Sequence, residues 1–179
     1  IARVGKEAGV DVPFLRPIEL ASDQAGTVDV LIHCLDHYKA NGEQFDIVAL
    51  FEPTSPLREE TDFQKALEIL IANEAAESVV SVCAAEAQNP AFLYSLEKTA
   101  KLTPLSSESG GHVPRQEIKP VYFPDGTMYV SYADSLRSRK SFYHDRTFAY
   151  EVPRWKAIEV DEIHDFICVE ALLKFNNNN

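Results

Sequence analysis

Two carboxylates near the end of the chain, Glu159 and Asp161, have the types and spacing that could bind a divalent cation. The segment Trp155–Val160 has the composition of a β-strand, and residues two apart in a strand point to the same face. Carboxylate oxygens suit Mg²⁺ that is bridged to phosphate oxygens. The alternative is structural, with Glu159 facing solvent and Asp161 capping the helix that follows.

The loop Glu52–Arg58, with the sequence EPTSPLR, is a second candidate site. It directly follows the apolar run Asp46–Phe51, so it should lie at the carboxyl edge of a sheet, where open α/β sheets bind their ligands. Pro53 restricts Glu52 to an extended conformation and stiffens the loop. A rigid structural turn would explain the same pattern equally well.

A third group combines one arginine with several aromatic residues. Arg115 carries a guanidinium that can bind a carboxylate through two parallel hydrogen bonds. The aromatic residues that could form the walls of a sugar pocket are Tyr122, Tyr129, Phe142 and Tyr143. A small aromatic core or a subunit interface would account for the last two nearly as well.

Metal and phosphate motifs of the common kinds are weak or missing. His33 and His37 lie one helical turn apart with Cys34 beside them, a spacing that can hold zinc. No further group of ligands accompanies them, which favours a structural role. The seven glycines form neither a GxGxxG nor a GxxxxGK[ST] phosphate loop.

The elements that must position these residues alternate between helices and strands. Apolar stripes of helical period alternate with continuous apolar runs typical of buried strands. This alternation implies right-handed crossovers and a largely parallel sheet in an α/β protein. The predicted elements are helices over Val28–Tyr38 and Phe63–Ile71, strands over Ile47–Phe51, Val79–Cys83 and Trp155–Val160, and a closing helix after Asp161.

Residues 89–150 break this alternation with a Ser/Gly-rich stretch, short aromatic β-type segments and a charged stretch. We therefore expect an excursion of residues 89–150 that packs outside a core made of residues 1–88 and 151–179. The aromatic content of the excursion exceeds what so small an appendage can bury alone. Because interfaces favour such residues, we expect the excursion to form a homodimer.

Composition argues against several classes of protein. Among 179 residues, 28 are acidic and 17 basic, giving a net charge of −11 without the basic stripe that nucleic-acid binding requires. No apolar run approaches about 18 residues, so no membrane span is expected. Three well-separated cysteines argue for a reducing compartment, so we expect a cytoplasmic protein.

Several segments together resemble the acylneuraminate cytidylyltransferases, the CMP-sialic acid synthetases with their legionaminic and pseudaminic acid relatives. The resemblance covers Val10–Phe175, and the stretch from Phe142 to Trp155 is most similar to the legionaminic type. The segments that carry the resemblance, in the family's order, are RPIELASD (16–23), EPTSPLR (52–58), SVVSV (78–82), Arg115-Gln116 ahead of GTMY (126–129), and EVD (159–161).

The resemblance implies a Rossmann-like nucleotidyltransferase fold, a homodimer, and a transfer of CMP from CTP to a nine-carbon acid sugar with Mg²⁺ as cofactor. Glu159 and Asp161 would act catalytically and hold the metal. The family's pattern also implies binding residues. For the nucleotide these are Arg16, Ala25, Thr27 and Glu52, and for the sugar they are Arg115, Tyr129, Phe142 and Tyr143.

Two departures from the family pattern shape the expectations. The family begins with a strand and a loop of the type ARxGSKGxxxKN, and this sequence instead begins with what resembles the end of a helix, Ala2–Gly9. We therefore expect that an N-terminal strand-loop-helix unit is missing and that this chain alone is inactive. Position 52 is Glu where many members carry Gln, which suggests a different acyl pattern on the sugar.

Two alternative functions remain open from the sequence. One is the related cytidylyltransferase for the eight-carbon acid 3-deoxy-manno-octulosonate, which the EPTSPLR loop fits poorly. The other is a non-catalytic nucleotide-binding or dimerisation module.

Overall fold

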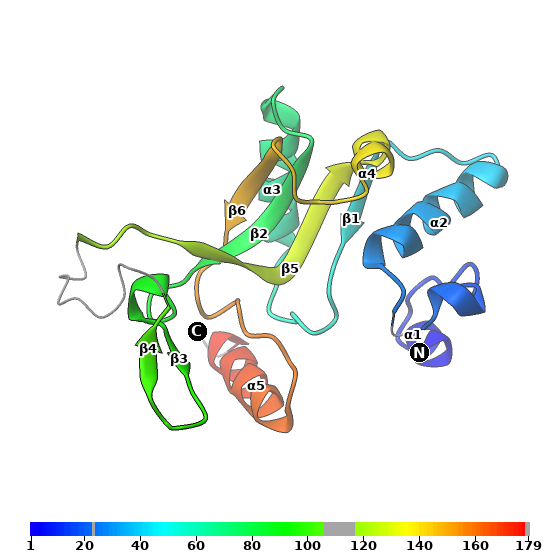
Figure 1. Cartoon of the computed structure of the whole chain (residues 1–179). Coiled ribbons are helices and arrows are strands. Elements are labelled where there is room, and N and C mark those ends of the chain that lie inside the picture. The colour runs from blue at the N-terminus through cyan, green and yellow to red at the C-terminus, as the bar shows by residue number, and fades with distance from the viewer. Residues whose placement is uncertain (23, 106–116, 178–179) are drawn as a thin grey trace.

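The computed structural model describes residues 1–22, 24–105 and 117–177. Its centre is a four-stranded sheet with helices on both faces (Figure 1). The strands, in their order across the sheet, are β1 (Ile47–Leu50), β5 (Tyr122–Tyr132), β2 (Ser78–Ala84) and β6 (Thr147–Glu151).

The sheet is mixed, so the prediction of a largely parallel sheet is wrong. Only β2 and β6 pair in parallel, because β5 runs antiparallel to both β1 and β2. The chain reaches β5 from the carboxyl end of β2 without a crossover helix, and a strand that enters from that edge must run in the opposite direction. The alternation of strands and helices is therefore interrupted after β2 and resumes from β5 onward.

Two strands of the sheet come from the segment expected to pack outside it. All of β5 and all of β6 except Glu151 lie within residues 89–150, and Met128 and Val130 of β5 are fully buried. Only the described residues between β2 and β5 extend away from the sheet (Figure 1). These form η2 (Pro90–Phe92) and the hairpin of β3 (Tyr94–Leu96) and β4 (Leu102–Pro104).

Two further strand predictions need correction. Residues 155–160 form a turn and an irregular segment instead of a strand. The run Ile47–Leu50 is a strand, yet it lies at the edge of the described sheet and is only half-buried. A continuous apolar run is typical of an interior strand, which shows that composition alone did not settle its position.

The helices form two layers against the sheet, since successive residues of a strand face opposite sides. On one face, Val79, Met128 and Val130 pack against Ala66 and Leu70 of α3. On the other face, Val80 and Tyr129 contact residues of α2, α4 and the loop after α4. The helices are α1 (Ala2–Glu7), η1 (Ile18–Leu20), α2 (Thr27–Ala40), α3 (Glu60–Ala72), α4 (Ala133–Arg139) and α5 (Ile163–Asn177).

The histidine pair of α2 packs against an aromatic ring. Phe14 stacks on His37 with ring centroids 4.0 Å apart and contacts His33 edge-on at 5.6 Å. In the part of the chain that the structure describes, no three His, Cys, Asp or Glu side chains are grouped to hold a metal ion. These contacts support the structural interpretation of the pair.

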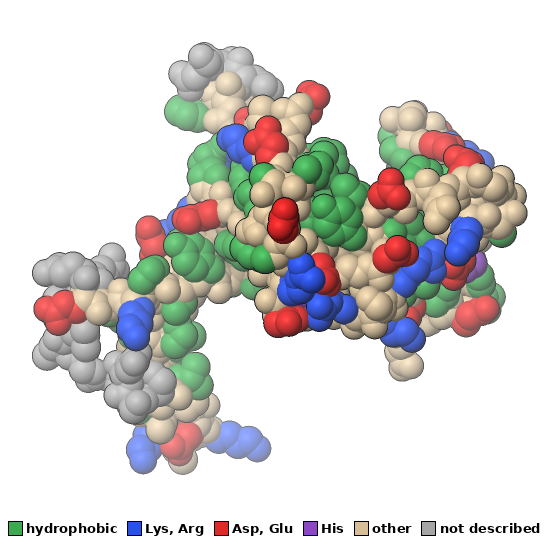
Figure 2. Space-filling view, turned by 90° about the horizontal axis from the view of Figure 1, so that it is seen from above, with side chains coloured by type: hydrophobic (Ala, Val, Ile, Leu, Met, Phe, Trp, Pro, Cys, Tyr) green, Lys and Arg blue, Asp and Glu red, His purple; other side chains and the backbone are tan. Residues whose placement is uncertain are grey.

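Charged side chains of both signs are interspersed over the face that Figure 2 presents. At the amino end of β2, Glu77 forms ion pairs with Arg139 at 2.5 Å and with Arg146 at 2.7 Å. Hydrogen bonds from Arg139 and then Ser135, together with the charges of both arginines, lower the pKa of Glu77 to about 2. Among the described helices, none has both the length and the apolar character needed to cross a bilayer.

A buried ion pair fastens the segment after β6 to α3. The Lys156 ammonium, 4% exposed, donates to both carboxylate oxygens of Asp62 at 2.8 Å and to Glu59 at 2.5 Å. The Tyr150 hydroxyl donates to Asp62 at 2.8 Å. Burial alone would raise the pKa of Asp62, but the hydrogen bonds from Lys156, the Glu59 N–H and Tyr150 lower it. Asp62 is therefore held ionised inside the protein.

Replacement of Lys156 by Met should destabilise the protein strongly, because it leaves the Asp62 carboxylate buried without a counter-charge. We expect a loss of about 3–5 kcal/mol in the free energy of unfolding, measured by urea denaturation. The double variant Lys156→Met with Asp62→Leu should recover much of this loss, since neither charge remains. Equal stability of the single variant and the wild type would contradict the importance of the pair.

Candidate active site

A pocket of about 230 Å³ opens at the carboxyl edge of β1. Five residues that the sequence predicts for nucleotide or sugar binding line it together, although they are spread over more than one hundred positions of the chain. The lining residues are Thr27, Val28, Leu50, Glu52, Tyr129, Lys140, Ser141, Phe142 and Tyr143.

Aromatic rings form one wall of this pocket. The rings of Tyr129 and Phe142 lie 5.3 Å apart, and Tyr143 meets Tyr129 edge-on at 6.2 Å. Phe142 is buried, whereas Tyr143 is 52% exposed. Burial and a hydrogen bond with Tyr143 raise the pKa of Tyr129, so its hydroxyl remains protonated. The wall is thus a rigid apolar surface that also carries the hydrogen-bonded hydroxyl groups of Tyr129 and Tyr143.

The EPTSPLR loop is held from inside by its own arginine. One guanidinium nitrogen of Arg58 donates to the carbonyl oxygens of Glu52 at 2.9 Å and Ser55 at 2.8 Å. The guanidinium also lies 5.1 Å from the ring centroid of Phe51. Burial lowers the pKa of Arg58. Arg58 therefore stabilises the loop that presents Glu52, and the structural interpretation of this motif is correct for its arginine.

A wide bulge in β5 faces the same loop. Val80 pairs with Tyr129 but Val82 pairs with Pro124, so four residues of β5 lie opposite Ser81. At this point the Ser81 hydroxyl accepts a hydrogen bond from the Met128 N–H at 2.9 Å and donates one to the Met128 carbonyl at 3.1 Å. Such bulges bend a strand and redirect its side chains.

Gly126 allows a close approach at this bulge. Its φ of +71° lies in the left-handed region that favours glycine. A Cβ at this position would overlap with a carboxylate oxygen of Glu159 and lie 2.9 Å from the Ser55 hydroxyl. That hydroxyl donates to the Asp125 carbonyl at 3.2 Å. The bulge, the loop and Glu159 thus converge at Gly126.

Glu159 and Asp161 lie in an irregular segment that is tied to the loop. The Val160 N–H donates to the Thr54 carbonyl at 2.7 Å. The Asp165 carboxylate accepts the N–H groups of Asp161 and Glu162 at 3.0 and 2.8 Å, so Asp165, and not Asp161, caps α5. The prediction of a strand here is wrong, and the segment instead lies beside the loop through this backbone bond.

Four carboxylates influence one another at this place. Burial raises the pKa of Glu159, and the neighbouring Asp161, Asp125 and Glu52 raise it further. Asp125 is fully buried, and its Oδ1 has no hydrogen-bond partner among the described residues. The Thr127 hydroxyl donates to its other oxygen. Sequence reasoning missed Asp125, whose position in a Pro-Asp-Gly sequence indicates only a turn.

The donor set fits a hard cation that keeps part of its own hydration shell. Mg²⁺ is commonly bound through one or two carboxylates together with waters and substrate phosphates, so a group of three protein ligands is not needed. The orphaned Asp125 oxygen and the mutual repulsion around Glu159 are features that a nearby cation would relieve.

Five predicted residues do not line the pocket or cannot be placed, and two of them are Glu159 and Asp161, which lie in the segment beside the loop. Arg16 is exposed ahead of η1, and Ala25 lies in the turn before α2; neither is among the pocket's lining residues. Arg115 lies outside the described residues.

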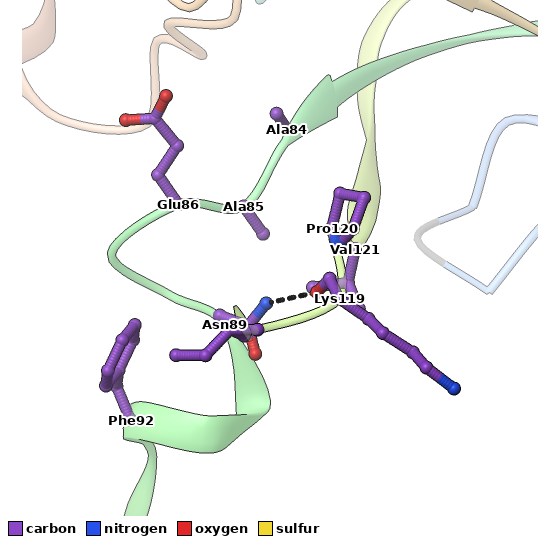
Figure 3. A pocket seen from close by; sticks show the side chains of 9 residues that line it. Ala84, Ala85, Glu86, Asn89, Phe92, Lys119, Pro120 and Val121 are labelled. Carbon is purple, nitrogen blue, oxygen red and sulfur yellow. Dashed lines mark hydrogen bonds between the residues drawn. The ribbon is translucent and has the colours of Figure 1, made fainter. Parts of the chain in front are cut away.

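A second pocket, of about 310 Å³, lies beyond the carboxyl end of β2 (Figure 3). Small apolar residues form much of its wall, and Asn89 closes one side by donating to the Lys119 carbonyl at 3.0 Å. Of the predicted site residues, none that the structure describes lines this second pocket. The pocket at β1 is therefore the candidate active site.

Comparison with known proteins gives related sequences, although no family model matches the chain. The N-acylneuraminate cytidylyltransferase of Streptococcus agalactiae serotype III is 31% identical over 170 residues, which cover 95% of this chain and 39% of that protein. The CMP-N,N'-diacetyllegionaminic acid synthase of Legionella pneumophila is 28% identical over 177 residues, covering 98% of this chain and 75% of that protein. The post-translational flagellin modification protein B of Campylobacter coli is 29% identical, with coverages of 99% and 74%.

A solved structure supports the fold. The CMP:2-keto-3-deoxy-manno-octonic acid synthetase complexed with CTP superposes with a TM-score of 0.56 at 17% identity, covering 86% of this chain and 70% of that one. The chain spans about two fifths of the length of the streptococcal enzyme. These likenesses confirm the resemblance that the motifs indicate: over nearly its whole length the chain is similar to the acylneuraminate cytidylyltransferases, and it shares the α/β fold of the CMP:2-keto-3-deoxy-manno-octonic acid synthetase.

Proposed function

We propose that the protein is a cytidylyltransferase that activates a nonulosonic acid of the sialic or legionaminic type with CTP. The observation that carries this proposal is the gathering of Thr27, Glu52, Tyr129, Phe142 and Tyr143 in one pocket. Relatives named for this activity support it. In the reaction the anomeric hydroxyl of the acid sugar attacks the α-phosphorus of CTP, a new P–O bond forms, and the bond to pyrophosphate breaks.

The pocket would position the acid sugar. The rings of Tyr129 and Phe142 offer an apolar surface for one face of the sugar ring. The Glu52 carboxylate accepts hydrogen bonds only, so it would receive hydroxyl or amide N–H groups of the substrate. Arg115 remains the proposed partner of the sugar carboxylate. Holding both reactants in line supplies much of the rate enhancement in such a transfer.

The nucleotide would lie along the first turn of α2. Thr27 is the first residue of this 14-residue helix, whose unpaired N–H groups favour an anion. Arg16 and Ala25 precede the helix and are proposed to lie near the cytidine. Phosphoryl-type transfer needs charge neutralisation more than covalent catalysis, and this chain carries a net charge of −11.

Glu159 and Asp161 would hold a Mg²⁺ ion. When bound, the ion neutralises phosphate charge and orients the α-phosphate. The chain's own contribution is to fix the two carboxylates beside the loop, through the bond from the Val160 N–H to the Thr54 carbonyl.

The test of the proposed function is release of pyrophosphate from CTP and Mg²⁺ with a panel of acid sugars. We expect turnover with a nonulosonic acid, identified by mass spectrometry of the CMP-sugar. The fold likeness to the CMP:2-keto-3-deoxy-manno-octonic acid synthetase makes the eight-carbon acid the second candidate. Turnover with that acid alone would replace the proposal, and binding of CTP without turnover on any acid would favour a non-catalytic module.

We also propose a homodimer formed through the β3–β4 hairpin. Leu96 and Leu102 are paired across the two strands and are 71% and 60% exposed. Exposed apolar side chains gathered in this way are typical of interaction surfaces.

Replacement of both hairpin leucines by Ser should convert the dimer to a monomer in light scattering, because the apolar contact is lost. The control is Ile71→Ser, since Ile71 is 61% exposed on α3, away from the hairpin. A wild-type protein that is monomeric at micromolar concentration would exclude the dimer.

Glu159→Gln and Asp161→Asn should each weaken binding of Mn²⁺, used as a paramagnetic substitute for Mg²⁺, because each removes a hard anionic oxygen. We expect a loss of about 10- to 100-fold in metal affinity, measured by electron paramagnetic resonance, with a matching loss of activity. The exposed neighbour Glu162 provides the control variant, Glu162→Gln. Unchanged Mn²⁺ affinity in the double variant would disprove the metal assignment.

Gly126→Ala should impair the site in two ways. The left-handed backbone would cost about 1–2 kcal/mol, and the new Cβ would push the Glu159 carboxylate away from its position. We expect lower thermal stability and weaker Mn²⁺ binding. Gly42 gives a matched control, because its φ is +86° with no atom near its Cβ position. Gly42→Ala should lose stability only, and equal Mn²⁺ affinity in both variants would contradict the role of the close approach.

A further inference from the structure

Lys140 lines the candidate active site although no sequence motif points to it. It lies in the loop after α4, next to Ser141 and the aromatic residues Phe142 and Tyr143. Of the described residues that line the pocket, Glu52 is the acidic one and Lys140 the basic one. An anionic substrate entering a chain of net charge −11 requires such a local cation.

The backbone at Lys140 is unfavourable for a lysine. Its φ of +51° and ψ of +33° place it in the left-handed region, and its N–H donates to the Leu136 carbonyl at 2.9 Å. This is the residue that ends a helix in the left-handed conformation, where glycine or asparagine is preferred. Ala100 is the other non-glycine residue with positive φ in the described part of the chain. A lysine here has a conformational cost that helix termination alone does not explain.

The turn at Lys140 also sets the aromatic wall. Beyond it, the Ser141 hydroxyl accepts the Tyr143 N–H at 2.9 Å and donates to the Tyr143 carbonyl at 3.0 Å. Phe142 is thereby directed inward, where it packs with Val80 and Leu136. The turn that follows Lys140 therefore holds the aromatic residues of the pocket in place next to it.

Among the described residues, the Lys140 ammonium has no partner, whereas the neighbouring cations are paired. Arg137 pairs with Asp36 at 2.6 Å, and Arg139 and Arg146 pair with Glu77. For Lys140 the described residues provide neither an ion pair nor a side-chain hydrogen bond. Three of the four cations between residues 137 and 146 thus have structural roles, and the one at the pocket is free to bind a ligand.

We propose that Lys140 binds the carboxylate of the acid sugar together with Arg115, as a second cation for the same group. This inference rests on the proposed function and adds a specificity residue to it. The aromatic wall beside Lys140 suits a sugar ring, so the anion presented next to that wall is the sugar's carboxylate. The other anion of the reaction is the CTP phosphate, and the test distinguishes the two.

The test separates the effect of the Lys140 charge from the effect of its left-handed backbone conformation. Lys140→Asn and Lys140→Gly remove the ammonium but suit the conformation, so both variants should be at least as stable as the wild type. We expect the KM for the acid sugar to rise about tenfold, with the KM for CTP unchanged, because a charge-assisted bond is lost. Lys140→Arg should recover most of the affinity.

Two controls keep the interpretation clear. Lys65→Asn removes an exposed lysine from α3 on the other face of the sheet, and Ala100→Gly relieves a left-handed residue in the β3–β4 turn. Neither should change either KM. An unchanged KM for the acid sugar in Lys140→Asn would overturn the proposal, and a raised KM for CTP alone would assign Lys140 to the nucleotide.

Failure of the proposed function would be visible separately. Calorimetry with N-acetylneuraminate as the probe measures binding to the wild type and to Lys140→Asn without turnover. Binding that the variant loses, in a protein without turnover, would retain Lys140 as a carboxylate site and reject the enzyme activity. A wild type that neither binds nor converts any acid sugar would overturn both.

Discussion

The buried ion pair between Lys156 and Asp62 is the constraint on which the site depends. An ammonium this deep in a protein must be matched by a carboxylate, and the geometry with two oxygens of Asp62 and one of Glu59 leaves little freedom. Both acidic residues belong to the start of α3, which follows the EPTSPLR loop directly. The segment that carries Glu159 is consequently fixed to the same part of the chain that presents Glu52.

The reversed strand β5 supplies the second half of the arrangement. Because it runs antiparallel between β1 and β2, its residues pass the carboxyl edge of both neighbours before they enter the core. The bulge opposite Ser81 occurs at this edge. There Gly126 approaches the Glu159 carboxylate closely, and Tyr129 lines the pocket. A strand parallel to β1 and β2 would instead reach this edge only at its own carboxyl end.

Electrostatics sets the chemical character of the place. Carboxylates from three separate segments approach one another around Glu159, whose pKa is raised by burial first and then by these neighbours. Such crowding is unfavourable in isolation and becomes favourable with a cation beside it. The pocket beside it is lined by aromatic rings and by Lys140, for which the described residues provide no ion pair, so Glu52 is the carboxylate shared between the acidic cluster and the pocket.

Local sequence determined the early elements and the identity of the loop. The apolar periods of Val28–Tyr38 and Phe63–Ile71 lie within α2 and α3, and Ile47–Leu50 and Ser78–Ala84 are strands as predicted. These helices and strands depend on residues that are close in the chain, so the apolar periodicity of the sequence is enough to predict them. The motifs also indicated Thr27, Glu52, Tyr129, Phe142 and Tyr143, which the structure gathers around one pocket.

Only the tertiary structure decided the direction of β5, the irregular conformation of residues 155–160 and the parts played by Asp125 and Lys140. Strand direction depends on which edge of the sheet the chain re-enters, a long-range property that no local pattern contains. Trp155–Val160 has the composition of a strand, but the pairing of Lys156 with Asp62 holds it against α3 instead. In the sequence, Lys140 resembles any surface lysine. Its left-handed backbone and its place beside the aromatic wall arise from the packing of α4 against the sheet, so only the structure reveals them.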